Sequence, residues 1–241
     1  MDVSTAHALV TGGATGIGHA TAGLLARHGA RVAITGRRAD RLEQAAREIA
    51  EATGAIVVAI PGDVGVEADC IRMVAEARDR LGGYDTLINN AGIGSFARLL
   101  DVTADDMRRV WETNVLGATL MARESARHFV AQQRGHIVNV ASTAGRRAGP
   151  GASAYASTKY ALTGLSEIWR AELRPSNVRV MQVNPSEVLT PFFEAAGVGA
   201  RPDNPTKLRP EDIAHVIVSM LRLDDRAFVT EASVWATNPK D

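Results

Sequence analysis

A tyrosine and a lysine that could transfer a proton together stand four residues apart in this chain of 241 residues. Residues at positions i and i+4 share one face of a helix, so the ammonium of Lys159 is expected beside the phenol of Tyr155. A free tyrosine has a pKa of about 10, and a fixed positive charge lowers that pKa. The pair therefore predicts a general acid and base tuned toward the working pH; the alternative is a solvated pair on a helix surface.

A glycine-rich segment, Thr11 to Gly18, connects the first apolar run to the first helical pattern. Its glycines permit a tight turn, and a helix N-terminus offers free amides and partial positive charge to a phosphate. The spacing is G-x-x-x-G-x-G. A purely structural turn is the alternative, but the position after a strand favours a nucleotide site. The candidate cofactor-binding residues here are Gly12, Thr15, Gly16, Ile17 and Gly18.

The end of the second apolar run indicates which dinucleotide would bind. An NAD site places a carboxylate there to accept a hydrogen bond from the ribose 2′-hydroxyl. This chain has Gly36 followed by Arg37 and Arg38, and guanidinium groups bind phosphate well. We therefore predict NADP(H) rather than NAD(H), with one of the two arginines allowed to be merely solvated.

Two further strand ends carry candidate contacts to the nucleotide. Asp63 and Val64 follow the third apolar run; the aspartate either accepts from the adenine amino group or caps the next helix. Asn89 to Gly92 closes the fourth run, where a tight turn is structural, contacts the cofactor, or does both. The candidates from this turn are Asn90, Ala91 and Gly92.

Apolar runs alternate with helical patterns along the whole chain, which predicts a mostly parallel sheet with helices on both faces. The expected strands are residues 7–11, 31–35, 55–60, 85–89, 136–141, 178–183 and 227–235. The expected helices are residues 16–29, 38–53, 66–81, 103–132, 155–173 and 210–221. We predict one domain over residues 1–241, with the Pro- and Gly-rich residues 186–209 as a substrate-binding lid.

The composition excludes several classes of protein. The formal net charge is zero, so nothing favours nucleic acid or an anionic membrane surface as a partner. The N-terminal residues lack the pattern of a signal peptide, and no apolar run is long enough to span a membrane. The one cysteine, Cys70, is interpreted as a small core or surface residue rather than a nucleophile. We expect a cytoplasmic protein, and no metal site is predicted.

Taken together, these motifs resemble the classical branch of the short-chain dehydrogenase/reductase family over nearly the whole chain. The resemblance rests on Thr11 to Gly18, Asp63-Val64, Asn89 to Gly92, Asn114, Ser142, Tyr155-x-x-x-Lys159 and Asn184-Pro185 with Thr190. It implies a single Rossmann-like, doubly wound α/β domain with seven parallel strands in the order 3-2-1-4-5-6-7. It also implies an oxidoreductase that interconverts alcohols and carbonyls with a nicotinamide cofactor.

The resemblance also assigns roles to individual residues. Tyr155 would be the general acid and base, Lys159 would bind the nicotinamide ribose, and Ser142 would polarise the substrate carbonyl. Asn114 would position a water in the proton relay; its alternative is a helix asparagine bonded to a local carbonyl. Further contacts to the nicotinamide are implied for Pro185, Val188 and Thr190.

The family further implies a homo-oligomer, a tetramer or else a dimer. The helices that hold Asn114 and Tyr155 would make the contact, with the small side chains of Ala118, Ala122 and Ala126 permitting close packing. The alternative is that these alanines pack on the chain's own sheet.

Two features depart from the family pattern. Ser186 stands where the family commonly has glycine, so we expect a less flexible loop on the nicotinamide side. The glycine-rich C-terminal tail is missing, which weakens a close match to the carrier-protein 3-oxoacyl reductases. The substrate pocket is expected between residues 94–98, 145–153 and the lid, with Phe192 and Phe193 as an apolar wall. The small-molecule carbonyl or alcohol itself stays open: a 3-oxoacyl thioester, a 3-hydroxy acid, a polyol or a xenobiotic ketone. The rival interpretation is a sensor or scaffold that binds NADP(H) without turnover.

Overall fold

The computed structural model describes residues 1–199 and 202–237. Residues 200–201 of the expected lid and 238–241 at the end of the expected domain lie outside the described residues. The strands are β1 (His7–Thr11), β2 (Arg31–Gly36), β3 (Val57–Pro61), β4 (Thr86–Asn89), β5 (Gly135–Val140), β6 (Val178–Pro185) and β7 (Glu231–Val234). The helices are α1 (Gly16–Arg27), α2 (Ala39–Thr53), α3 (Glu67–Leu81), α4 (Ala104–Trp111), α5 (Ala118–Ala131), α6 (Ser153–Leu173), α7 (Phe192–Ala195) and α8 (Pro210–Leu221).

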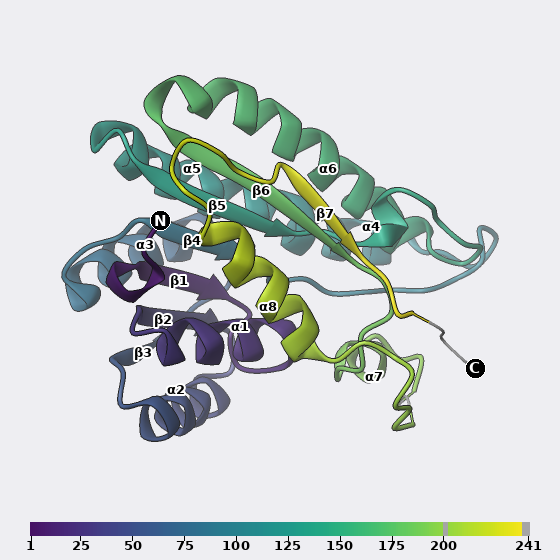
Figure 1. The fold of residues 1–241 in the computed structure, drawn as a ribbon. Helices are drawn as coiled ribbons and strands as arrows, with labels where there is room; N and C mark the ends of the chain where they lie inside the picture. Colours follow the sequence, from purple (N-terminus) through teal and green to yellow (C-terminus); the bar gives the residue numbers. More distant parts are fainter. Residues whose placement is uncertain (200–201, 238–241) are drawn as a thin grey trace.

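All seven strands are parallel and form one sheet in the order β3-β2-β1-β4-β5-β6-β7, which confirms the predicted fold (Figure 1). β1 pairs with both β2 and β4, so the direction of winding reverses between β1 and β4. In open parallel sheets, ligands bind outside the carboxyl ends of the strands at such a reversal. The fold therefore places the glycine turn after β1 at the centre of a ligand crevice.

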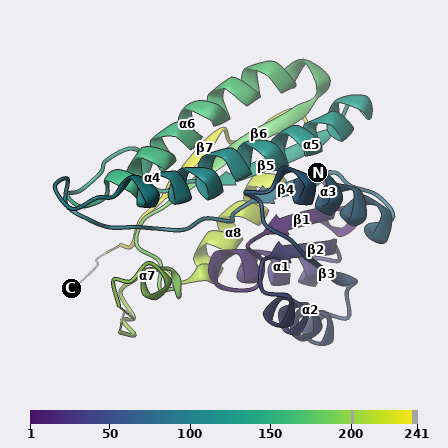
Figure 2. The same ribbon diagram turned by 180° about the vertical axis from the view of Figure 1, so that it is seen from behind.

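Two apolar layers hold the helices on the sheet. Alternate residues of one strand face opposite layers: Val10 packs with α1, α2 and α8, whereas Leu9 packs with α3, α5 and α6. Figure 2 shows the second face, with α4, α5 and α6 lying across the strands. Because both faces are covered, the central strands are apolar along nearly their whole length, as a buried parallel sheet requires.

Helix ends follow the local sequence. Gly54 and Gly82 end α2 and α3 in the left-handed conformation, with φ of 70° and 73°, which glycine adopts without a steric cost. The Thr103 hydroxyl accepts from the backbone N–H of Asp106 at 3.0 Å and so caps α4 as predicted.

The helical region expected over residues 103–132 is present, but a π-helical turn, Glu112–Gly117, divides it into α4 and α5. Such a turn inserts a residue without changing the apolar pattern enough to be seen. The last strand is Glu231–Val234 rather than residues 227–235, because the carbonyl of Ala227 accepts from Arg179 instead of joining the ladder.

Candidate active site

The glycine turn after β1 has the geometry that a pyrophosphate needs. Gly12 and Gly16 have φ of +66° and +56°, a region that strongly favours glycine. A Cβ at Gly18 would lie 2.4 Å from the carbonyl oxygen of Gly12, so only glycine fits the close approach of α1 to the turn. The N-cap residue of α1, Thr15, makes no side-chain capping bond. The first amides of the helix are therefore left for an anionic ligand.

The turn after β4 is tied directly to this glycine turn. The side-chain amide of Asn90 donates to the carbonyls of Thr11 and Gly12 at 2.9 and 3.3 Å. The hydroxyl of Thr11 accepts from the backbone N–H groups of Asn90 and Ala91 at 2.9 and 2.8 Å. Of the alternatives for this segment, the structural role is thus present. Thr11 begins the glycine-rich segment but was not among the predicted binding residues, because the spacing of the glycines does not show that its hydroxyl bonds a second turn.

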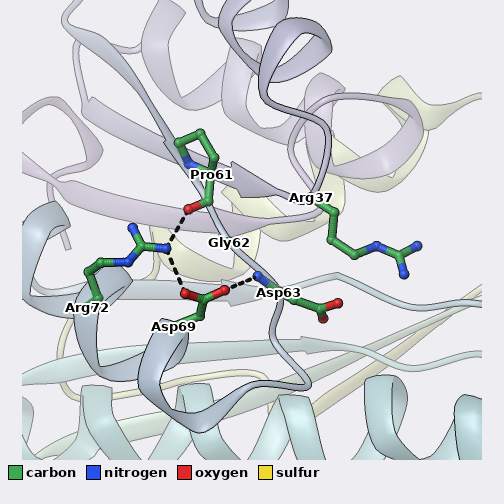
Figure 3. A pocket seen from close by; sticks show the side chains of 6 residues that line it. All are labelled: Arg37, Pro61, Gly62, Asp63, Asp69 and Arg72. Carbon is green, nitrogen blue, oxygen red and sulfur yellow. Dashed lines mark hydrogen bonds and ion pairs between the residues drawn. The ribbon is translucent and has the colours of Figure 1, made fainter.

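A cavity of about 400 Å³ lies at the carboxyl ends of β2 and β3 (Figure 3). Its lining residues are Arg37, Pro61, Gly62, Asp63, Asp69 and Arg72. Arg37 follows the end of β2 and lines this cavity (Figure 3). Its neighbour Arg38 is the N-cap residue of α2 and is not among the lining residues. The structure thus separates the two arginines that the sequence treated alike.

Two carboxylates also line this cavity, and they come from the connection after β3 and from α3 rather than from the end of β2. Asp69 accepts from the backbone N–H of Asp63 and from Arg72, at 2.8 and 2.9 Å, and these bonds hold its pKa below the usual range. Asp63 accepts from the backbone N–H of Gly65 at 3.0 Å, which is a local turn bond. The next residue, Val64, is buried against Gly117 of the π-helical turn.

Tyr155 and Lys159 converge in the first turns of α6. The ammonium of Lys159 lies 5.7 Å from the centroid of the Tyr155 ring and donates to the carbonyl of Val140 at 2.9 Å. Lys159 is buried, whereas Tyr155 is partly exposed. Ser142 follows β5 and caps a short 3₁₀ turn by accepting from the N–H of Ala144. The side chains of Ser142 and Tyr155 are hydrogen-bonded to one another.

The pKa values of the pair differ from the expectation. Burial raises the pKa of Tyr155 to about 12, and the hydrogen bond with Ser142 only partly opposes that rise. Burial also lowers the pKa of Lys159 to about 8. The predicted lowering of the tyrosine pKa is therefore wrong, because burial has the largest influence and the hydrogen bond with Ser142 is what opposes it. At neutral pH the phenol holds its proton.

Asn114 lies inside the π-helical turn and joins three segments around the pair. Its side-chain oxygen accepts from the N–H of Ile93 at 2.8 Å, and its side-chain nitrogen donates to the Ile93 carbonyl at 2.9 Å. The same nitrogen donates to the hydroxyl of Thr158 at 3.0 Å. The side chain thus fixes the loop after β4 against α6 and does not bond a local helix carbonyl. Gly92 covers this corner: a Cβ there would lie 3.3 Å from the Asn114 oxygen and 3.7 Å from the Lys159 nitrogen.

The segment after β6 returns over the glycine turn. A Cβ at Gly16 would lie 3.2 Å from the methyl carbon of Thr190, so Thr190 sits directly above the turn. The carbonyl of Pro185 accepts from the hydroxyl of Ser142 at 3.5 Å. Val188 is buried and pairs with Leu208 in an isolated bridge, which closes the base of the lid. Of the three, Thr190 is the one in contact distance of the glycine turn, and their contacts to a nicotinamide stay a prediction.

Other groups of the described chain have structural rather than reactive surroundings. Cys70 is buried, and burial raises the pKa of its thiol to about 11, so it packs rather than attacks. Among the described residues no cluster of three His, Cys, Asp or Glu side chains could hold a metal ion. None of the described helices combines the length and apolar character that crossing a membrane requires.

Comparison with known proteins places this site in a family. The sequence pattern of the family described as short chain dehydrogenase matches residues 6–198. The uncharacterized oxidoreductase YxnA of Bacillus subtilis (strain 168) is 35% identical over 191 residues, which are 78% of this chain but 53% of that protein. The uncharacterized oxidoreductase SAR2567 of Staphylococcus aureus (strain MRSA252) is 30% identical over 227 residues, 94% of this chain and 95% of that protein. The chain thus spans about half the length of the first relative and nearly all of the second.

The fold and its relatives agree. An alcohol dehydrogenase from the archaeon Thermococcus sibiricus, solved in complex with 5-hydroxy-NADP, has a TM-score of 0.88 at 28% identity and covers 97% of this chain and 98% of its own. Similar solved structures hold NADP-type cofactors or NAD. With the family pattern spanning most of its length and a Rossmann sheet in the family's strand order, the chain belongs to the short-chain dehydrogenase/reductase family of oxidoreductases.

Proposed function

We propose that this protein is an NADP(H)-dependent oxidoreductase that interconverts a small ketone and the corresponding secondary alcohol. The observation that carries the proposal is the convergence of Ser142, Tyr155 and Lys159 beside the glycine turn, with the Lys159 nitrogen 5.7 Å from the Tyr155 ring. The left-handed glycines and free helix amides fit a dinucleotide at this place. When bound, the nicotinamide would supply or accept the hydride.

The chain's own residues would handle the proton and the oxygen. With a pKa of about 12, Tyr155 is protonated at neutral pH and would donate its proton to the oxygen that forms from a carbonyl. The Ser142 hydroxyl would hydrogen-bond the same oxygen and stabilise its developing negative charge. The Lys159 cation would then stabilise the phenolate that is left. Asn114 would hold the loop after β4 and α6 in register, so that the pair stays aimed at the crevice.

The preference for NADP(H) is the finer part of the proposal. Arg37 lines the cavity at the end of β2 and would bind a 2′-phosphate, while Arg38 lies outside it. Asp63 and Asp69 line the same cavity, but both accept backbone hydrogen bonds, and Asp69 is also paired with Arg72. These bonds offset part of the negative charge that would otherwise repel a phosphate.

We also infer that the protein works as a homo-oligomer joined through α5 and α6. Ala118 and Ala122 are buried within the chain itself, so they support the alternative of intramolecular packing. The exposed face nevertheless has a cavity of about 620 Å³ lined by both helices, including Trp169 and Leu173. Large apolar side chains also lie exposed on this side of the molecule, namely Leu116, Tyr160 and Ile168. Light scattering during size exclusion tests this inference, and a monomer of 25.6 kDa would contradict it.

A cytoplasmic location is proposed as well. Its support is that Cys70 is a buried free thiol, as expected in a reducing compartment. Fractionation of cells that express the protein at its natural level would test this.

The experiment that tests the activity is a panel of carbonyl compounds with NADPH, in which the wild type is compared with Tyr155→Phe. We expect turnover of at least one ketone by the wild type and its loss in the variant, because the phenylalanine has no proton to give. Equal turnover by both proteins would refute the mechanism. Tight NADP(H) binding without turnover of any carbonyl would instead support the sensor interpretation.

A further inference from the structure

Two phenylalanine rings pack against the ring of Tyr155, and a third phenylalanine packs against both of them. The centroid of Phe96 lies 5.5 Å from that of Tyr155, and the centroid of Phe192 lies 5.3 Å from it. Phe96 and Phe192 are 6.4 Å apart with planes at 82°, and Phe193 lies 6.0 Å from Phe96 and 5.6 Å from Phe192. Three of the five phenylalanines of the chain thus form one cluster, two of them in contact with the phenol ring. We call Phe96, Phe192 and Phe193 the phenylalanine box.

The box is assembled from two segments that meet over the crevice. Phe96 comes from the loop after β4, whereas Phe192 and Phe193 form the start of α7 in the lid. Gly94 lies beneath them: a Cβ there would be 2.8 Å from the Phe192 ring and 2.9 Å from the Phe96 ring. A bare backbone at Gly94 therefore lets the rings close to contact distance. The spacings and tilted planes are those that aromatic pairs prefer.

Among the described residues, three cations on the segments expected to border the pocket are paired with carboxylates. Both hydrogen-bonding nitrogens of Arg146 donate to the carboxylate of Glu231 on β7. In the lid, Lys207 pairs with Glu187 at 2.9 Å, and Arg209 pairs with Asp203. Arg98 and Arg147, on the two other segments that border the pocket, are exposed to solvent. On the lid side, the side chain packed against the Tyr155 ring is therefore an uncharged aromatic one, Phe192.

We propose that the phenylalanine box receives a flat, uncharged aryl group attached to the reacting carbon, so that the preferred substrates are aryl ketones and the corresponding secondary alcohols. This inference rests on the proposed function of Tyr155. An aryl ring takes up the edge-to-face contacts that the three rings already make with one another. A carboxylate or polyol in the same place loses hydration without gaining partners. Among the substrate classes left open by the sequence, the box favours the apolar ketone over the acyl thioester, the hydroxy acid and the polyol.

The test compares acetophenone, cyclohexyl methyl ketone and acetoacetate as substrates of the full chain with NADPH. The cyclohexyl compound matches the size of acetophenone without its π-system. We expect kcat/KM for acetophenone to exceed that for the cyclohexyl ketone about fivefold, and that for acetoacetate about a hundredfold. Phe192→Leu should reduce the ratio between acetophenone and the cyclohexyl ketone to near one. Phe228 lies outside the box and packs against the core layer that contains α1, α2 and α8. Phe228→Leu should therefore leave that ratio unchanged.

Binding measured by calorimetry separates this inference from the proposed function. If acetophenone binds the wild type and binds Phe192→Leu about fivefold more weakly, while no carbonyl compound is reduced, aryl binding in the box is supported and the oxidoreductase proposal is overturned. Turnover in which acetoacetate equals or exceeds acetophenone would overturn the box and leave the oxidoreductase intact. Neither binding nor turnover of acetophenone would overturn the box, and unchanged ratios in Phe192→Leu would do the same. A thermal unfolding curve for each variant confirms that it is folded.

Discussion

The two sides of the crevice are built by different means. On the side of β1 to β3, which we call the cofactor half after the proposed function, the shape comes from the backbone: left-handed glycines, a helix approaching at contact distance, and carbonyls bonded to Asn90. On the side of β4 to β6, which we call the catalytic half for the same reason, it comes from side chains on α6 such as Tyr155 and Lys159. We therefore expect added side-chain volume in the cofactor half to weaken NADPH binding, and removal of a functional group in the catalytic half to lower kcat.

The largest expected effect is on the catalytic half. Tyr155→Phe keeps the ring contacts with Phe96 and Phe192 but removes the hydroxyl that holds the proton. We expect kcat to fall about a thousandfold, within the range for loss of a general acid. The dissociation constant for NADPH, measured by fluorescence titration, should change little because the glycine turn is untouched. A large loss of NADPH affinity in this variant would show that the two halves are not separate.

The corresponding change in the cofactor half is Gly18→Ala. Its added Cβ would lie 2.4 Å from the carbonyl oxygen of Gly12 and 2.5 Å from the side-chain nitrogen of Asn90. Because a backbone atom must move, NADPH affinity should fall about a hundredfold, and overpacking should lower the free energy of unfolding by about 1–3 kcal/mol.

Gly23→Ala is the matched control in the same helix. No atom lies within 4 Å of the position that the added methyl group would take, and alanine is the better helix former, so stability should rise by about 0.5–1 kcal/mol. NADPH affinity should stay at the wild-type value. If both variants bind NADPH equally well, the glycine turn does not act through close approach.

Buried Lys159 predicts a pH dependence of stability. Its folded pKa of about 8 lies below the ordinary lysine value of 10.5. Between these two pH values the unfolded chain holds the proton and the folded chain does not, so this group makes stability rise with pH, by up to about 1.4 kcal/mol per pH unit. The measurement is urea unfolding of the wild type and Lys159→Met from pH 7 to pH 10.

The comparison with Lys159→Met isolates the lysine. Cys70 and Tyr155 have pKa values raised by burial to about 11 and about 12, so each lowers stability at high pH. The contribution of Cys70 is present in both proteins and cancels in the difference. That of Tyr155, a neighbour of Lys159, begins only near the ordinary tyrosine pKa of 10.0, at the upper end of the measured pH range. The free energy of the wild type minus that of the variant should increase with pH above about 8. A flat difference would mean that Lys159 is solvated as ordinary lysines are.

The sequence predicted features that depend on local patterns. Strand order followed from the family motifs, the end of α2 from Gly54, and the i, i+4 pair from helical spacing. Features that depend on burial or on distant segments were missed. The pKa of Tyr155 moves upward because solvent is excluded by rings from two other segments, and no spacing within α6 encodes that.

The cofactor cavity shows the same limit. The residues after β2 predicted two equivalent arginines and no carboxylate. In the structure, the connection from β3 into α3 brings Asp63 and Asp69 into the same cavity as Arg37. The difference between Arg37 and Arg38 arises because the helix α2 begins after Arg38, which turns successive side chains in different directions. The proximity of Arg37 to Asp63 and Asp69 becomes visible only when the pairing of β2 with β3 places the ends of the two strands side by side.

The smallest expected effect concerns this cavity, and it tests whether side-chain charge also acts in the cofactor half. Arg37→Asp places a carboxylate where a 2′-phosphate would bind, so the ratio of kcat/KM for NADPH to that for NADH should fall about tenfold or more, the effect of losing one charge-assisted hydrogen bond. Arg38→Asp makes the same change of charge outside the cavity and should shift the ratio much less. Equal shifts in the two variants would mean that long-range charge, rather than a contact from Arg37, sets the preference. A wild-type preference for NADH would contradict the NADP(H) assignment itself, while leaving the division between a backbone-built and a side-chain-built half in place.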